Sequence, residues 1–259
     1  LNNRNLHDLT IDVGRTAQLA PLVPEGKVVV SESGIRNNHT VRQHGAHANA
    51  FLVGSHLTGT PDIDRAAREL VFGSNKVCGL TTWSAAQTAR AAGAVYGGLI
   101  FEDASTRNVS RETALEIIAH EPDLTYVAVS RRTTGWEELA LDGIDCFQIH
   151  TPYQGSTDAE RELINSVRAV AGERQVWRAI DMTAPHGPSL AAALADAADI
   201  LILDSGSGGT GTSFDWSTIP DTVKEKSLLA GGLNPSNFTE ALRVGTVGLD
   251  LNSGLEING

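Results

Sequence analysis

From residue 76 onward, short apolar runs alternate with stretches whose apolar residues recur at helical spacing. The apolar runs predict eight strands, at 76–80, 94–101, 124–130, 144–150, 175–180, 199–205, 227–233 and 246–252. Helices are predicted between them at 84–93, 110–120, 158–172, 189–198 and 235–245. Strands that are apolar on both faces and alternate with helices are typical of parallel βαβ units. Eight such units predict an α/β fold, a (β/α)8 TIM barrel, whereas the alternative, a doubly wound open sheet, usually needs only about five or six strands.

Residues 1–73 carry the same alternation in a shorter series. A strand end is predicted at 1–6, strands at 27–35 and 49–55, an irregular helix at 8–23, and helices at 37–45 and 62–73. About three βα units are too few to close a barrel, so we expect a first domain over 1–73 and a barrel domain over 74–259. Few residues follow the eighth predicted strand, and we therefore expect the last outer helix of the barrel to be missing from this chain.

Composition narrows the classes of partner. The net charge is -11 and no Lys/Arg cluster occurs, so neither nucleic acid nor an anionic membrane surface is an expected partner. No apolar stretch approaches the roughly 20 residues that span a bilayer, and the first residues lack a signal-peptide core. Two cysteines are too few for a disulfide framework, which favours a reducing cytoplasm. No metal-binding, nicotinamide or flavin motif is visible, so no metal or cofactor is predicted.

In a barrel of this kind, chemistry lies where the strands end. Cys78 ends the first predicted strand and Asp204 the sixth. A free cysteine is more often a small buried hydrophobic residue, and we expect this structural role for Cys146. Cys78 remains a candidate base, provided that positive charge or N–H donors lie near its thiol. Asp204 follows four apolar residues, so it either caps the loop backbone or acts as an acid. The glycine run 206–211 after it is a weak signal by itself.

Other strand ends suggest a substrate with a carboxylate and a phosphate. Arg107 is the one cation in the loop after the second strand, and it either pairs with a substrate carboxylate or makes a surface ion pair with Glu102 or Asp103. Gln148 and His150 end the fourth strand, where such residues either contact substrate or serve as structural hydrogen-bonding groups. Small residues follow both the seventh and eighth strands, in "LLAGGLNPSN" and "LDLNSGLE", where barrels frequently bind phosphate and where two ordinary tight turns are the alternative.

Seven segments taken together resemble a known family. "KVCGLT", "GAVYGGLIF", "STRNVS", "FQIH", "LILDSGSGGTGTSFDW", "LLAGGLNPSN" and "GLDLNSGLE" resemble phosphoribosylanthranilate isomerase of tryptophan biosynthesis, from about residue 75 to the last residue. "LNNRNL", "VVVSESGI" and "NAFLVGS" are similar to the ends of the last three barrel strands of indole-3-glycerol phosphate synthase, over residues 1 to about 73. The two enzymes occur fused in this order in some bacteria. The chain therefore resembles part of a bifunctional protein, and the remaining N-terminal synthase barrel is a further expected partner.

The resemblance implies an Amadori rearrangement of N-(5-phosphoribosyl)anthranilate to 1-(2-carboxyphenylamino)-1-deoxyribulose 5-phosphate without a cofactor. It makes Cys78 the general base and Asp204 the general acid, and it places Arg107 on the anthranilate carboxylate. It assigns the phosphate end to Gly231, Gly232, Asn234, Asp250, Ser253 and Gly254. Two alternatives stay open. One is a histidine-pathway or dual-substrate isomerase, although that family has an aspartate where Cys78 stands. The other is a truncated barrel that binds sugar phosphates without turnover.

The first domain matches the synthase only in part. Its remnant of a synthase site comprises Asn2, Arg4, Glu32, Ser33, Gly54 and Ser55, of which the last two match that family's phosphate site. The earlier strands of the family, which carry its catalytic lysines, have no counterpart in this sequence. Synthase activity of the first domain is therefore not expected.

Overall fold

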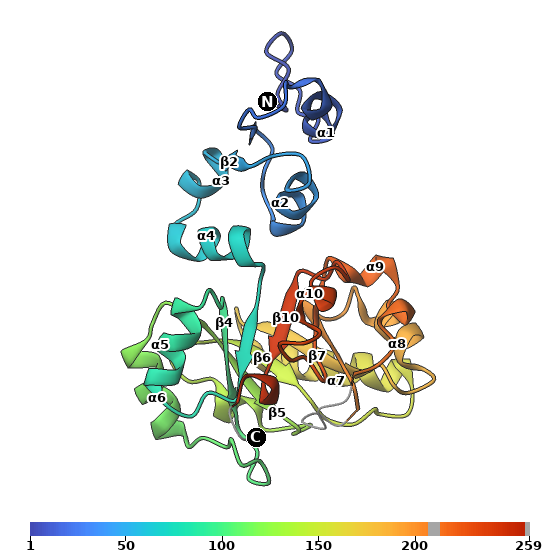
Figure 1. Cartoon of the computed structure of the whole chain (residues 1–259). Helices are drawn as coiled ribbons and strands as arrows, with labels where there is room; N and C mark the ends of the chain where they lie inside the picture. The colour runs from blue at the N-terminus through green and yellow to red at the C-terminus, as the bar shows by residue number, and fades with distance from the viewer. Residues whose placement is uncertain (207–212, 257–259) are drawn as a thin grey trace. The chain divides into compact units, whose positions relative to one another are not determined.

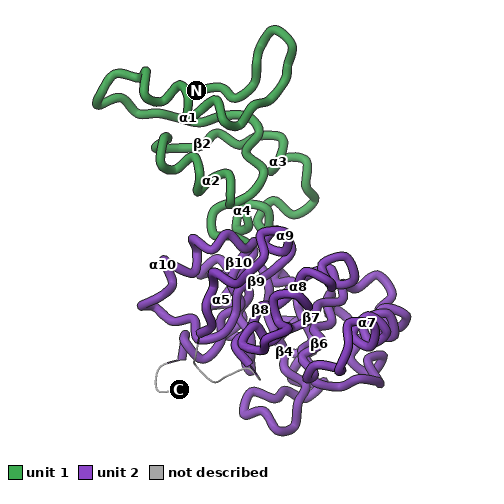
Figure 2. The backbone as a smooth tube through the Cα atoms, turned by 90° about the vertical axis from the view of Figure 1, so that its right-hand side faces the viewer, with its two compact units in different colours: residues 1–73 green, residues 74–259 purple. Residues whose placement is uncertain are grey.

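The structure is a computed structural model of the chain that describes residues 1–206 and 213–256. The chain forms two compact units, Leu1–Gly73 and Ser74–Gly259, coloured separately in Figure 2. The glycine run noted in the sequence falls almost wholly on 207–212 and so lies outside the described residues. Within the described ranges, no helix combines the length and the apolar character that crossing a membrane requires.

Unit 2 (residues 74–259) contains eight parallel strands that close into a barrel (Figure 1). The neighbours around the barrel follow the order β10-β3-β4-β5-β6-β7-β8-β9. The strands are β3 (Lys76–Cys78), β4 (Tyr96–Ile100), β5 (Thr125–Ser130), β6 (Ile144–Ile149), β7 (Gln175–Asp181), β8 (Ile200–Asp204), β9 (Ser227–Leu229) and β10 (Gly248–Leu251). The predicted α/β barrel of eight strands is confirmed.

Helices lie around the outside of these strands (Figure 1). They are α5 (Trp83–Ala91), α6 (Arg111–His120), α7 (Thr157–Ala171), α8 (Gly187–Leu194), α9 (Asp221–Lys224) and α10 (Phe238–Ala241), with 3-10 turns at Trp136–Leu139, Trp216–Thr218 and Ser253–Leu255. Thr82, Ser110 and Ser156 precede α5, α6 and α7, and each side-chain oxygen accepts a bond from the backbone N–H three residues later. The helix predicted at 235–245 is reduced to α10, because Asn234 and Asn237 bond to loop backbone where its first turn would form.

Side chains alternate along the strands between two buried layers. Val127 and Val129 of β5 belong to one hydrophobic cluster, while Tyr126 and Ala128 belong to the other. Because successive side chains of a strand point to opposite faces, one cluster fills the barrel interior and the other packs the strands against the helices. Cys146 lies in the interior cluster at 1% exposure, so packing accounts for this second cysteine.

Unit 1 (residues 1–73) is built around two short parallel strands, β1 (Val30–Glu32) and β2 (Ala50–Leu52). Its helices are α1 (Arg15–Leu19), α2 (Asn38–His44), α3 (Ser55–Thr58) and α4 (Ile63–Phe72), with a 3-10 turn at Ala20–Leu22. The strand end expected at 1–6 is reduced to a single parallel bridge from Asn2 to Glu32 of β1, and Arg4 makes an antiparallel bridge to Ile11. The irregular helix expected at 8–23 is observed over its second half only, where α1 passes into the 3-10 turn that contains Pro21.

Candidate active site

A cavity of about 280 Å³ lies at the carboxyl ends of the barrel strands. Its wall contains ten of the eleven residues predicted for the isomerase site: Cys78, Arg107, Gln148, His150, Asp204, Gly231, Gly232, Asp250, Ser253 and Gly254. Asn234 is the exception. Its amide nitrogen donates to the Gly232 carbonyl at 3.0 Å, and its oxygen accepts from the Ser236 backbone, so the side chain is used within its own loop.

The strand register explains why Cys78 and Asp250 meet at this cavity. Lys76 and Cys78 are two residues apart on β3, so both side chains point to the barrel interior. Asp250 on β10 pairs with Lys76, and Gly98 on β4 pairs with Cys78. The first and last strands of the barrel thus bring a cation, a thiol and a carboxylate together.

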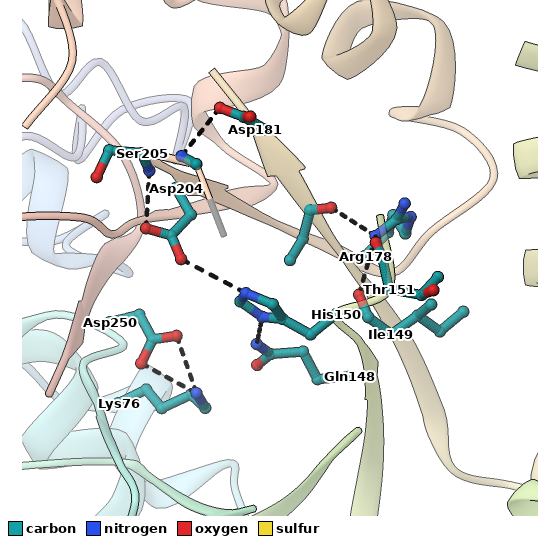
Figure 3. A network of polar contacts seen from close by, with 12 residues as sticks. Lys76, Gln148, Ile149, His150, Thr151, Arg178, Asp181, Asp204, Ser205 and Asp250 are labelled. Atoms are coloured by element: carbon teal, nitrogen blue, oxygen red, sulfur yellow. Dashed lines mark hydrogen bonds and ion pairs between the residues drawn. The ribbon is translucent and has the colours of Figure 1, made fainter. Parts of the chain in front are cut away.

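Asp250 forms an ion pair with Lys76 that is almost out of solvent (Figure 3). Lys76 Nζ donates to both carboxylate oxygens, at 3.0 and 2.9 Å, and its side chain is 0% exposed. Burial by itself would lower the pKa of Lys76, but attraction to Asp250 and to Cys78 outweighs it and raises that pKa to about 12. Lys76 therefore carries its positive charge throughout the physiological range of pH.

The groups around the Cys78 thiol have opposing effects on its pKa. Burial raises its pKa above the usual value, the Lys76 ammonium lowers it, and Asp250 and Asp204 raise it further. The cysteine is therefore a weak acid in the free protein, and Lys76 is the group that favours its thiolate most. This is the positive charge that a basic role for Cys78 requires.

Asp204 ends β8 and is 7% exposed. Burial raises the pKa of its carboxyl to about 6, although the Ser205 backbone N–H donates to Oδ1 at 2.7 Å and opposes that rise. A carboxyl with such a pKa holds its proton in an appreciable fraction of molecules near neutral pH, as a general acid must. Asp204 therefore caps the loop backbone with one oxygen, while its side chain lies on the cavity wall.

His150 faces that second oxygen. Its Nε2 lies 3.7 Å from Asp204 Oδ2, and the Gln148 amide donates to its Nδ1 at 3.2 Å (Figure 3). Burial, together with the positive charges of Lys76, Arg178 and Arg131, lowers the pKa of His150 to about 4, so the ring is neutral at pH 7. Because Nδ1 accepts from Gln148, the ring proton is on Nε2, directed at Asp204.

Arg107 pairs with a residue far along the chain. Its Nε and Nη2 donate to the two oxygens of Glu256 at 2.6 and 2.7 Å, so neither Glu102 nor Asp103, the partners considered from the sequence, forms this pair. Glu102 instead accepts from Ser130 Oγ at 2.7 Å. Arg107 thus already holds a carboxylate in the two-bond geometry expected for a substrate carboxylate.

The loops after β9 and β10 touch through glycine. A Cβ built on Gly254 would lie 1.8 Å from the Leu233 carbonyl oxygen, a distance that no side chain could occupy. The two loops can approach each other only because residue 254 has no side chain. Both loops contribute to the cavity wall, at the position where the sequence predicted an anion site.

Two buried polar atoms on the cavity wall have no hydrogen-bond partner among the described residues, Gln148 Oε1 and Asn252 Oδ1. Buried polar atoms are nearly always bonded, so both are suited to a ligand's donor groups. In the same ranges, 1–206 and 213–256, no cluster of His, Cys, Asp and Glu is arranged to hold a metal ion.

Lys76, Glu102 and Asn252 were not among the predicted site residues. Lys76 could have been predicted from the sequence, because a lysine two residues before a strand-end cysteine lies on the same face of the strand as that cysteine. Asn252 follows the eighth strand directly and could have been found by the same strand-end rule as Ser253. Glu102 follows the second predicted strand, 94–101, directly and could have been found by the same rule.

In unit 1, a separate cavity of about 330 Å³ has all six predicted synthase-remnant residues on its wall, namely Asn2, Arg4, Glu32, Ser33, Gly54 and Ser55. They come from the ends of β1 and β2 and from the N-terminal segment. Arg4 Nη1 donates to the Leu9 carbonyl at 3.0 Å, which holds that side chain in place.

Comparison with known proteins finds two families along the chain. The profile described as N-(5'-phosphoribosyl)anthranilate (PRA) isomerase matches residues 75–259, and that of indole-3-glycerol phosphate synthase matches residues 1–70. The tryptophan biosynthesis protein TrpCF of Corynebacterium glutamicum is 61% identical over 257 residues, which cover 99% of this chain and 54% of that protein. The chain thus spans about half the length of the curated relatives it matches.

Solved structures resemble the barrel unit. Phosphoribosylanthranilate isomerase from Thermotoga maritima has a TM-score of 0.59 and 26% identity, covering 71% of this chain and 90% of that one. Another isomerase structure, at 24% identity and a TM-score of 0.54, covers 71% of this chain and 89% of its own and shares the fold. That protein was solved in complex with reduced 1-(o-carboxyphenylamino)-1-deoxyribulose 5-phosphate.

Proposed function

The chain belongs to the N-(5'-phosphoribosyl)anthranilate isomerase family, and on that basis we propose that it converts N-(5'-phosphoribosyl)anthranilate to 1-(2-carboxyphenylamino)-1-deoxyribulose 5-phosphate. The observation that carries this proposal is that Cys78 and Asp204 lie on the wall of one cavity, each at the end of a barrel strand. The relatives are tryptophan biosynthesis proteins, and we place this chain in the same pathway.

The first step needs an acid. The Asp204 carboxyl donates its proton to the ribose ring oxygen, the bond from that oxygen to C1 breaks, and a protonated imine forms between C1 and the anthranilate nitrogen. A pKa of about 6 suits this task, because a strongly acidic aspartate would rarely hold the proton at neutral pH. The Nε2–H of neutral His150 faces the carboxylate left behind and stabilises it.

The second step needs a base. The Cys78 thiolate removes the proton from C2, and the electron pair of that C–H bond forms the C1–C2 double bond while the imine nitrogen becomes neutral. The resulting enolamine tautomerises to the product ketone. The Lys76 charge favours the thiolate before the step, and the thiolate is regenerated when the proton on sulfur returns to solvent.

The remaining groups of the substrate match two parts of the cavity wall. Arg107 would take the anthranilate carboxylate in place of Glu256, since both carboxylates offer the same pair of oxygens. The backbone N–H groups of Gly231, Gly232, Ser253 and Gly254 would receive the phosphate. We also expect, from the use of only two cysteines, that the protein works in the reducing cytoplasm.

The decisive experiment follows the fluorescence of the anthranilate substrate during conversion by Cys78→Ser and Asp204→Asn. Each change should lower kcat by about 100- to 10,000-fold, the range for loss of one acid or base group. The matched control is Cys146→Ala, which removes the other cysteine from the interior layer and should leave kcat within a few-fold of the wild type. Near-normal turnover by either site variant would overturn the acid and base roles of Asp204 and Cys78.

The same assay separates the two alternatives. A barrel that only binds sugar phosphates would leave the fluorescence unchanged in the wild type while still binding a phosphate analogue. A dual-substrate enzyme would also isomerise the histidine-pathway aminoaldose, and the two rates can be compared directly. Conversion of the anthranilate compound alone is the expected result.

A further inference from the structure

We propose that Lys76 is a positioning residue for Cys78: its buried ammonium favours the thiolate form of Cys78, and Asp250 limits how strongly it does so. This inference rests on the proposed function, which makes Cys78 the base. It assigns Asp250 to the thiol's charge balance rather than to the phosphate end where the resemblance placed it.

The strand register supplies the first argument. Lys76 and Cys78 lie on the interior face of β3, and Asp250 on β10 is in direct register with Lys76. Both carboxylate oxygens accept from Lys76 Nζ, at 3.0 and 2.9 Å. Lys76 has no exposed surface, so its charge acts on its neighbours inside the barrel and is screened little by solvent.

Gly98 supplies the second argument. It faces Cys78 across the β3–β4 pair, and a Cβ built on it would lie 2.8 Å from Cys78 Sγ and 3.0 Å from Lys76 Cε. The end of the lysine side chain and the sulfur therefore pass over the same glycine Cα. The absence of a side chain at residue 98 allows the ammonium to approach the thiol.

The charges facing the thiol come from four places. Lys76 lies on β3, Asp250 on β10, Asp204 on β8 and Arg107 in the loop after β4, while β4 itself presents Gly98. Among them Lys76 acts most strongly and lowers the pKa of Cys78, whereas Asp250 and Asp204 raise it. A buried ion pair contributes little net stability compared with apolar residues, so stability alone does not account for the Lys76–Asp250 pair. An effect on the ionisation of the Cys78 thiol does account for it.

The test measures how the alkylation of Cys78 by iodoacetamide depends on pH in the full chain, because only the thiolate reacts. Lys76→Met should move the midpoint of the rate profile upward by about one unit or more, which means roughly tenfold slower alkylation below the midpoint. Asp250→Asn should move the midpoint downward, because it removes the negative charge that opposes the thiolate. Cys78→Ser gives the background from Cys146, and Lys226→Met, a lysine outside the cavity, should leave the midpoint unchanged.

Opposite shifts in the two variants are the signature of charge balance. A purely structural role would leave both midpoints at the wild-type value or move both in one direction, and either result would overturn the proposal. If Lys76→Met fails to fold because Asp250 is left unpaired, Lys76→Met/Asp250→Asn removes both charges together. Its midpoint should still lie above that of the wild type, since Lys76 has the larger effect, and a midpoint at or below the wild-type value would also contradict the proposal.

Failure of the proposed function is distinguishable from failure of this inference. Normal fluorescence turnover by Cys78→Ser would remove Cys78 from the mechanism, whatever the alkylation profiles show. Unshifted alkylation midpoints, alongside an inactive Cys78→Ser, would leave the base in place and remove Lys76 as its positioning residue.

Discussion

The carboxyl group of Asp204 is buried where its ionisation is unfavourable, so the free energy of unfolding should depend on pH. Its pKa rises from 3.8 to about 6 in the folded chain. A raised pKa means that the folded state binds the proton more tightly, so the stabilisation is complete below about pH 4 and is lost as the pH rises through 6. Asp204→Asn keeps the shape and cannot ionise. It should therefore be more stable than the wild type above pH 6, by on the order of 3 kcal/mol, and equal to it at pH 4.

Urea unfolding of both proteins at pH 4 and at pH 7.5 tests this prediction. The amide oxygen of the variant can still accept from the Ser205 N–H, so the loop contact is not removed with the charge. Equal stabilities at pH 7.5 would mean that the wild-type carboxyl ionises there without penalty. We expect Asp204→Asn to be more stable and less active than the wild type, because an active site often keeps a charge that destabilises the fold.

At the scale of single residues, sequence position predicted which side chains reach the cavity better than it predicted their partners. Cys78 and Asp204 were found because a side chain that ends a barrel strand must lie at the mouth. The partner of Arg107 was missed because Glu256 is 149 residues away, and that of Asp250 because Lys76 is 174 residues away. Spacing along the chain reveals neighbours within one element, whereas these pairs depend on how the barrel closes.

At the scale of elements, Arg178 ties helix α7 to the barrel. Its Nε and Nη2 donate to Glu160 of α7 at 2.7 and 2.8 Å, and its Nη1 donates to the carbonyls of Thr151 and Ala179. Arg178→Met should lower the free energy of unfolding by about 3–5 kcal/mol, because the buried Glu160 carboxylate loses its ion-pair partner and keeps, among the described residues, only the bond from the Gln154 backbone N–H. The free energy of unfolding of Arg178→Lys should lie between those of the wild type and Arg178→Met, because a lysine keeps the charge but cannot form the paired bonds.

Chemical unfolding measures these costs, and Arg178→Met/Glu160→Gln is the control that removes both charges. It should recover most of the stability lost in the single variant. If the double variant is as unstable as Arg178→Met, then the stability is lost because the hydrogen bonds from Arg178 to the backbone carbonyls are missing, and not because Glu160 is unpaired.

The contact between the β9 and β10 loops gives a second prediction at this scale. Gly254→Ala would place a methyl group on the Leu233 carbonyl, so the loops must separate. KM for the phosphorylated substrate and the inhibition constant for inorganic phosphate should both rise about tenfold or more, while kcat changes less, because the acid and base lie on other strands. Gly155→Ala is the control: its φ of +91° strains the loop, but a Cβ there meets nothing within 4 Å, so both constants should stay unchanged.

Elements with a strong period were predictable, and those that depend on local polar contacts were not. The eight barrel strands follow from apolar runs of the right length, and each predicted position contains a strand. The segment 1–6 pairs with β1 through one bridge only, and the side-chain bonds of Asn3 with Ser31 and Thr16, which no periodicity reports, help to hold it in place. Loop polar contacts shortened the helix predicted at 235–245 in the same way.

At the scale of the molecule, the count of strands decided the architecture. Eight parallel strands with short connections can close on themselves, and closure brings the first strand beside the last. That single event creates the Lys76–Asp250 pair and completes the cavity wall. Among the described residues of unit 1, two strands pair with each other, and β1 makes one further bridge from Glu32 to Asn2.

This difference between the units predicts how the chain handles the product of its isomerase step. Unit 1 matches the synthase family over 70 residues and has two strands, so it lacks the closed barrel on which a complete site is assembled. The carboxyphenylamino-deoxyribulose phosphate should therefore accumulate in step with the loss of anthranilate fluorescence, without formation of indole-3-glycerol phosphate. Liquid chromatography with detection of indole absorbance follows both compounds. Addition of a separate, complete synthase should then consume the accumulated product, and indole absorbance before that addition would show that the two strands of unit 1 support more chemistry than their fold allows.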